Sequence, residues 1–128
     1  SLTLMTTTSA PSKLLPLGKL VLTRGVSTFI ETGEIYDLPY DETPTPLILD
    51  PKWRRHWLSV CVTSHASGDW GDTCSEDAQL NDDVRANPGT GGRLMSTWHR
   101  SGFPKLWIIT DDFGGPNCYT TCLWPSEY

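Results

Sequence analysis

The apolar residues of this chain fall into short runs whose spacing predicts both strands and helices. Residues 19–23 contain a Leu-Val-Leu run, which predicts a strand buried on both faces. Residues 93–100, 106–110 and 118–124 are rich in β-formers and are separated by Gly, Pro and Asn, which is typical of a β-meander. The sequence therefore predicts a small antiparallel sheet of three to four strands, made from the C-terminal meander and the early strand.

The longest helical pattern starts at Asp50-Pro51. An Asp at this position accepts hydrogen bonds from the free N–H groups of the first turn, and Pro fits the first helical position because no N–H is needed there. We expect the helix over residues 51–64, with Arg54 and the neighbouring basic residues mainly on the solvent side. Its apolar stripe is expected to contain Trp53, Trp57 and either Val60 or Cys61.

A second, acidic helix is expected from about residue 73 to residue 86 or 87, where Pro-Gly ends it. Thr73 and Glu76 have the spacing of a capping box, and the serine between them is the competing cap. Leu80 and Val84 lie four residues apart, which predicts that they form its inner face, with Ala78 or Asn81 nearby.

The remaining segments complete the expected architecture. Residues 26–34 predict a short helix with a serine or threonine cap near its start, and the proline-rich residues 35–49 predict a surface excursion. Residues 1–12 are expected to form a flexible tail. We therefore expect one α+β domain over residues 13–128, with two to three helices packed on one face of the sheet.

Composition and charge narrow the classes of protein to consider. The formal net charge of the 128-residue chain is −5, which argues against direct nucleic-acid binding because non-specific binding needs a basic surface. The sequence has no apolar run long enough to cross a membrane, and its start lacks the basic-then-apolar order of a signal peptide. The expectation is a cytoplasmic protein that does not bind membranes.

Four cysteines, Cys61, Cys74, Cys118 and Cys122, allow three interpretations. Two disulfides are one, but a chain of this size does not need them and no secretory signal is recognised. Zinc binding is another, but no C-x-x-C pair is present. We expect buried free thiols, because free Cys is among the most buried residue types, and we expect no metal or other cofactor.

The densest group of chemically special residues is His-Ala-Ser-Gly-Asp-Trp-Gly-Asp, which starts at His65. Its two glycines can adopt positive φ, which predicts a tight turn between the two longer helices. Such a turn could direct His65, Asp69 and Asp72 at one point, as a divalent metal or general acid–base catalysis requires. Asp111 and Asp112, at the end of the strongest strand, could complete the site of a metal-dependent hydrolase or nuclease.

The same motif also has a structural interpretation, which we favour. Gly68 would end the first long helix, and Gly71 would help to shape the turn. Asp69 would accept hydrogen bonds from N–H groups of the turn, Trp70 would fill a place in the core, and His65 would donate to a carbonyl near the end of the helix. The chain also lacks the G-x-S-x-G and P-loop motifs of common hydrolases and nucleotide-binding proteins.

Several short motifs accompany this one in a fixed order between Leu17 and the C-terminus. They are Gly18 with Thr23-x-Gly25, Glu76-Asp77 with Asn81, Gly92-Arg93-Leu94-x-Ser96, Trp107-Ile108-Ile109-Thr110 and Pro125-x-Glu127-Tyr128. With the motif that starts at His65, the set resembles a family of small bacterial proteins of unknown function encoded on plasmids and mobile elements. The family continues Ile-Ile-Thr with Glu-Ala-Asp-Arg, whereas this chain has Asp-Asp-Phe-Gly, and residues 35–49 form a longer loop here. The resemblance implies a mobile-gene context and a shared fold, and it brings no known activity.

A mobile-element context and an acidic chain favour a factor that binds another protein over an enzyme. In one version it is an anti-defence factor that binds a restriction or CRISPR component, with carboxylates that imitate nucleic-acid phosphates. The carboxylates expected to bind are Asp72, Glu76, Asp77, Asp82 and Asp83.

Two alternative functions and one assembly remain open. The cluster of His65, Asp69 and Asp72 is the basis for the metal-dependent hydrolase or nuclease. A small-ligand-binding module would use exposed aromatic residues such as Trp98, Trp107 or Trp124, arranged around a concave pocket. A homodimer would form if the C-terminal strand lay at an edge of the sheet.

Overall fold

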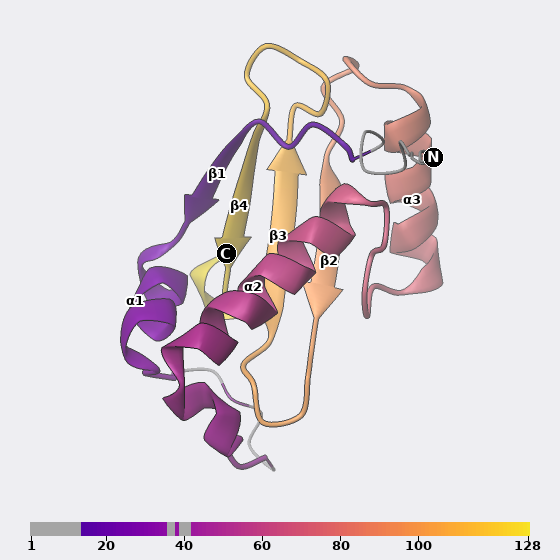
Figure 1. The fold of residues 1–128 in the computed structure, drawn as a ribbon. Coiled ribbons are helices and arrows are strands. Elements are labelled where there is room, and N and C mark those ends of the chain that lie inside the picture. The colour runs from indigo at the N-terminus through magenta and orange to yellow at the C-terminus, as the bar shows by residue number, and fades with distance from the viewer. Residues whose placement is uncertain (1–13, 36–37, 39–41) are drawn as a thin grey trace, which may run out of the picture.

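The computed structural model describes residues 14–35, 38 and 42–128, which form an α+β fold with three α-helices and a four-stranded sheet (Figure 1). The predicted tail at residues 1–12 lies outside the described residues. The elements follow one another along the chain as β1 Lys19–Leu22, α1 Arg24–Thr32, the 3-10 helix η3 Pro46–Leu49, α2 Pro51–Ala66, α3 Ser75–Ala86, β2 Leu94–Trp98, β3 Leu106–Asp111, β4 Tyr119–Leu123 and the 3-10 helix η4 Pro125–Glu127.

The strand order in the sheet is β1-β4-β3-β2. The last three strands form the predicted antiparallel meander, in which Trp107 of β3 lies opposite Thr97 of β2 and Leu123 of β4. β1 pairs with β4 in parallel, with Leu20 beside Thr120, so the sheet is mixed where a fully antiparallel one was expected. The three α-helices and strands β2 and β3 lie between β1 and β4 along the chain. A parallel pair needs a long connection of this kind.

The positions of β1 and β4 in the sheet decide two points that the sequence analysis raised. β1 is the edge strand, so Lys19 and Leu20 are exposed instead of buried on both faces. β4 lies between β1 and β3 and has no free edge. The C-terminal strand therefore cannot pair across a dimer in the way that the sequence analysis considered.

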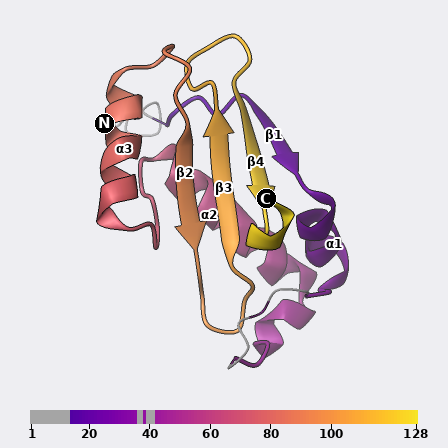
Figure 2. The ribbon, with the colours of Figure 1, turned by 180° about the vertical axis from the view of Figure 1, so that it is seen from behind.

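Two helices cover one face of the sheet, and the third lies beside its β2 edge (Figures 1 and 2). α1 and α2 pack over the sheet, whereas α3 flanks β2 on the side away from β1. Seen from behind, the opposite face of the sheet carries no described α-helix, and only the short η4 lies near its lower end (Figure 2).

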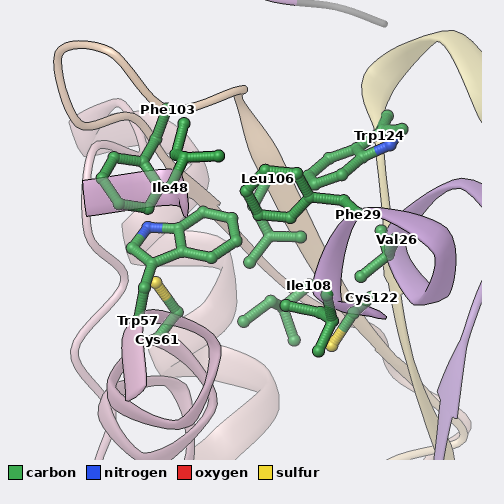
Figure 3. Packing of buried hydrophobic residues seen from close by; sticks show 11 residues of the cluster. Val26, Phe29, Ile48, Trp57, Cys61, Phe103, Leu106, Ile108, Cys122 and Trp124 are labelled. Carbon is green, nitrogen blue, oxygen red and sulfur yellow. The ribbon is translucent and has the colours of Figure 1, made fainter. Parts of the chain in front are cut away.

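The main core lies between α1, α2 and the sheet (Figure 3). Phe29 of α1 makes edge-to-face contacts with Trp57 and Trp124, with ring centroids 5.6 and 5.5 Å apart. Trp57 also packs against Phe103 of the β2–β3 connection. A second, smaller cluster under α3 consists of Trp70, Leu94 and Phe113.

α2 begins as the sequence predicts, because the side chain of Asp50 accepts a hydrogen bond from the Lys52 N–H and Pro51 is the first helical residue. Of the expected apolar stripe, Trp57 is buried, whereas Trp53 is 41% exposed. The expectation for Arg54 is wrong, since only 4% of it is exposed.

The buried guanidinium of Arg54 is satisfied by carbonyl groups at the end of α1 and in η3. It donates to the backbone oxygens of Ile30, Glu31 and Ile48. A buried charge is tolerated where hydrogen bonds replace its water, and here they tie α2 to two neighbouring segments. Ile48 is itself buried, so residues 35–49 are not simply a surface excursion.

α3 ends at Ala86 as expected, but its start and inner face differ from the prediction. Cys74 holds the cap position and no side chain makes a capping hydrogen bond, so the expected capping box does not form. Leu80 is 61% exposed, and Asn81 occupies the buried position beside it. Helical spacing alone could not distinguish these two adjacent positions, because Asn81 is held by a hydrogen-bonding role rather than by its hydrophobicity.

All four cysteines are free thiols. Cys61 and Cys122 are buried, and burial raises the pKa of each thiol to about 12. The expectation of buried thiols is wrong for Cys74, which is exposed, and Cys118 is partly buried.

Candidate functional site

The motif that starts at His65 spans the end of α2 and the turn that follows. The Gly68 N–H donates to the His65 carbonyl, and the Asp69 N–H donates to the Ser64 carbonyl. This pair of bonds is a common way to end a helix and needs a residue in the left-handed region, which Gly68 supplies with a φ of 83°. The helix thus ends where the structural interpretation of the motif placed its end.

His65 is fully buried between α2 and the sheet. Its Nδ1 lies 2.7 Å from Ser96 Oγ in β2, and its Nε2 lies 3.0 Å from Thr110 Oγ1 in β3. The Trp70 ring packs edge-on against the imidazole, with centroids 5.4 Å apart. Both ring nitrogens are therefore engaged with the core, and neither is directed at solvent or at the expected carbonyl.

The directions of these hydrogen bonds follow from a carbonyl at the end of the chain of hydroxyls. Thr120 Oγ1 donates its only hydrogen to the Leu17 carbonyl at 2.7 Å, because a carbonyl can only accept. Thr120 therefore accepts from Thr110, whose Oγ1 is 2.7 Å away. With its own hydrogen used in this way, Thr110 must accept from the Nε2–H of His65.

The other half of the network engages the second ring nitrogen. The Trp98 indole N–H donates to Ser96 Oγ at 2.7 Å, and Ser96 in turn donates to the unprotonated Nδ1 of His65. The hydrogen bonds thus run in one direction from Trp98 to the Leu17 carbonyl. They fix a hydrogen on Nε2, and in the neutral imidazole Nδ1 is then the acceptor for the Ser96 hydroxyl.

Burial acts in the same direction as this network. It lowers the pKa of His65 to about 4, because the charged imidazolium loses its hydration in the core. A second ring hydrogen on Nδ1 would also reverse the bond to Ser96 and leave that hydroxyl hydrogen without its partner. His65 is therefore neutral at physiological pH and acts as a hydrogen-bonding link between α2 and three strands.

The carboxylates of the motif face other groups. Asp69 Oδ1 accepts from the Gly71 N–H at 3.0 Å, which closes the turn, and Asp72 Oδ2 accepts from the His99 N–H at 2.7 Å. In the described part of the chain, neither carboxylate forms a hydrogen bond or an ion pair with His65. The described residues also contain no group of three or more His, Cys, Asp or Glu side chains placed to hold a metal ion.

Asp111 and Asp112 do not join the motif either. Successive strand residues point to opposite faces, so Asp111 lies on the face opposite Thr110 and His65, where it pairs with Arg93 Nε at 3.0 Å. Asp112 adopts a positive φ of 51°, and its carboxylate accepts the Asn117 N–H at 2.9 Å in the β3–β4 loop.

The acidic residues around α3 divide into two groups. Asp72 and Asp82 are used by the scaffold, since Asp82 Oδ1 accepts the Trp70 indole N–H at 3.0 Å. The phosphate-like row expected from the sequence is therefore interrupted. All four carboxylates of α3, Glu76, Asp77, Asp82 and Asp83, are exposed, and Asp83 also accepts from the Gln79 side chain at 3.2 Å.

The turn and α3 together close the outer edge of β2. The side-chain amide of Asn81 donates to the Met95 carbonyl at 2.7 Å and accepts from its N–H at 2.9 Å. The Thr97 N–H donates to Thr73 Oγ1, and the Thr97 carbonyl accepts from the Asp72 N–H. The backbone groups of this edge strand thus have partners, which prevents pairing with another strand.

Sequence reasoning missed the partners of His65. Ser96, Thr110 and Thr120 all occupy inward-facing strand positions and are fully buried. Hydroxyls at positions that alternate into an apolar core were a usable signal, because buried hydroxyls need a hydrogen-bond partner.

Two of the short motifs noted in the sequence also meet in space. The Glu127 carboxylate accepts from Thr23 Oγ1 at 2.6 Å and from the Gly25 N–H at 3.0 Å, so it caps α1 from the other end of the chain. Arg93 donates to the Tyr128 hydroxyl at 2.9 Å.

One surface feature left after these assignments is the open face of the sheet, which we define by Thr97, Trp107, Thr121 and Tyr128. Trp107 packs against Tyr128 with ring centroids 5.6 Å apart, and Tyr128 is 70% exposed. A concavity of about 370 Å³ lies at one side of this face. It is lined by Asp72, Thr97, Trp98, His99, Lys105 and Trp107. Trp124, the third expected surface aromatic residue, is buried in the main core.

Comparison of the chain with protein-family models, curated proteins and solved structures finds no match. None of the helices in the described residues is long and apolar enough to span a membrane.

Proposed function

We propose that this protein is an interaction factor that binds another protein through the open face of its sheet. The observation that carries the proposal is the lack of a described α-helix over this face, although it presents Trp107 and Tyr128. Aromatic side chains are enriched in the cores of protein interfaces, and a folded partner would cover the face as α1 and α2 cover the other one.

The adjacent concavity supports the same proposal. Trp98 and Trp107 form apolar parts of its lining, and Lys105 and Asp72 supply one charge of each sign. A pocket of this kind can take one anchoring side chain of a partner while the surrounding sheet face excludes water. The hydrolase or nuclease alternative has no comparable support, because His65, Asp69 and Asp72 face separate scaffold partners.

An anti-defence role is one version of this proposal, and it rests on the resemblance to mobile-element proteins. Glu76, Asp77 and Asp83 on α3 support contact with a basic patch on such a partner. Four exposed carboxylates on one helix, one of which accepts from the Trp70 indole, favour a local charge contact over imitation of an extended run of phosphates.

The test compares variants of exposed aromatic residues in affinity capture of partner proteins from host cells. Trp107→Ala and Tyr128→Ala should each abolish capture of a specific partner that the parent protein retains. Trp53→Ala, which removes an exposed tryptophan from α2, should leave that capture unchanged. Equal capture by the parent and all three variants would overturn the assignment of the binding face.

A small-ligand-binding function is a second candidate, favoured by the same concavity. Its volume of about 370 Å³ lies in the range of small-molecule sites. Screening small compounds by amide chemical shifts should then move the signals of Thr97 and His99. Compounds that bind only elsewhere would count against this candidate.

A further inference from the structure

We propose that the free edge of β1 binds an extended, acidic peptide segment of a partner protein by adding it to the sheet as a fifth strand. This interface lies away from the open face, so the inference goes beyond the function proposed above. It rests on the unpaired backbone of β1, the apolar groove beside it and the charge around that groove.

The unpaired backbone groups follow from the pairing of β1 with β4. The Thr23 N–H donates to the Cys122 carbonyl at 3.1 Å, so the backbone of Thr23 faces β4. Because backbone groups alternate along a strand, Val21 also faces β4, and the N–H and C=O groups of Leu20 and Leu22 point outward. No described strand lies on that side of β1 in either view (Figures 1 and 2).

The two edges of the sheet differ in a way that supports a binding role. The β2 edge is closed by Asn81, Thr73 and Asp72, whereas none of the described residues closes the β1 edge. An open edge is a template for strand addition, in which backbone hydrogen bonds give affinity and side-chain pockets give specificity.

A groove runs beside this edge on the helix-covered side of the sheet. It has a volume of about 290 Å³, and its apolar lining comes from Leu20, Ile30, Leu58 and Val62. Leu20 is 48% exposed there. A strand added to β1 would point alternate side chains towards α2, so one apolar side chain of the peptide would enter the groove.

The charge around the groove selects the kind of peptide. Arg55 is the charged residue among the described residues that line the groove. Lys19 is the first residue of β1, and Arg24 follows the strand at its other end. No acidic residue occurs between Leu14 and Ile30, although the net charge of the chain is −5. This local basic character favours an apolar peptide with Asp or Glu residues. It disfavours a second copy of β1, which would bring Lys19 and Arg24 of two molecules together.

The experiment selects short random peptides displayed on phage against the full chain and measures their affinities by calorimetry. We expect peptides in which apolar residues alternate with Asp or Glu. Leu20→Gln should weaken their binding by about tenfold or more, because tenfold corresponds to about 1.4 kcal/mol and burial of a leucine side chain contributes at least about that much. Leu80→Gln, which changes another exposed leucine, on α3, should leave the affinity unchanged.

Two further readouts separate this inference from the proposed function and from misfolding. Arg55→Glu changes an exposed side chain and should shift the selection from acidic to basic peptides. Bound peptide should slow hydrogen exchange at the Leu20 and Leu22 amides, and Trp107→Ala should not affect its affinity.

Three results would overturn the inference. The first is that no peptide is enriched on the parent protein. The second is that the enriched peptides bind Leu20→Gln as tightly as the parent. The third is that ultracentrifugation reveals a dimer without peptide and hydrogen exchange shows that its Leu20 and Leu22 amides are already protected.

Discussion

At the scale of single residues, the structure gives His65 a different role from the catalytic one that its sequence neighbours suggest. A histidine near two aspartates has the composition of a metal or acid–base site. In the structure, both imidazole nitrogens are hydrogen-bonded to buried hydroxyls, and the two aspartates accept backbone N–H groups. The residue is therefore part of the scaffold that joins α2 to the sheet.

Thr110→Val should lower the free energy of unfolding by about 1–3 kcal/mol, because it leaves the buried Nε2–H of His65 without an acceptor and removes the hydrogen bond that Thr120 accepts. Valine has nearly the same shape, so packing changes little. Thr121→Val is the matched control on the open face, and urea unfolding should place it within about 0.5 kcal/mol of the parent. Equal stability of the two variants would contradict the network.

The depressed pKa of His65 makes stability depend on pH. Its folded-state pKa of about 4 lies below the usual value of 6.5, so protons bind the unfolded chain more tightly. The stability from neutral His65 is complete above about pH 6.5 and is lost as the pH falls towards 4, by up to roughly 1.4 kcal/mol per pH unit.

Chemical unfolding between pH 7 and pH 4 measures this dependence. His65→Gln should be less stable at pH 7 and should show a shallower decrease on acidification than the parent. His56→Gln, at an exposed site on α2, should keep the slope of the parent. A parent slope that persists in His65→Gln would assign the titration to other groups.

At the scale of elements, α1 depends on a residue at the opposite end of the chain. Burial raises the pKa of Glu127, but hydrogen bonds from Thr23, Trp124 and Gly25 lower it by more. The net shift of this pKa is therefore downward. Glu127→Gln should destabilise the fold by about 1 kcal/mol at pH 7, the usual cost of a lost helix cap. Glu31→Gln, also on α1, should be nearly neutral in the same urea titration, and a similar loss in both would contradict the capping role.

The closed edge of β2 depends on Asn81. Asn81→Ala should cost about 2–3 kcal/mol, because it removes two hydrogen bonds to the Met95 backbone and leaves both groups unpaired. Native-state hydrogen exchange should show faster exchange at the Met95 amide. Asn87→Ala, at the exposed end of α3, should leave that amide protected, and unchanged protection in Asn81→Ala would show that the edge is closed by other groups.

At the scale of the whole molecule, local sequence patterns were sufficient to predict the helices and strands but not the contacts between segments far apart in the chain. Asp50-Pro51 correctly marked the start of α2, and the alternating apolar runs gave the three strands of the meander. The parallel pairing of β1 depends on a contact between segments about a hundred residues apart, which no local pattern encodes. The burial of Arg54 and Asn81 likewise depends on carbonyl and amide groups that only the folded chain brings near.

The candidate site shows the same division. The turn residues Gly68 and Asp69 could be assigned from the motif alone, because their roles involve neighbours in sequence. The role of His65 depends on Ser96 and Thr110, which are more than thirty residues away. The residue types of the motif therefore suggested a catalytic or metal site, whereas the folded chain uses them to stabilise the scaffold.

The most direct test of this account is the protonation of the His65 ring, followed by ¹⁵N NMR from pH 7.5 to pH 4. The account predicts a neutral ring with hydrogen on Nε2 over most of this range, and protonation only near its acid limit, with a pKa of about 4. A ring that titrates near 6.5, or one that carries its hydrogen on Nδ1, would contradict the buried network and restore His65 as a candidate for acid–base chemistry.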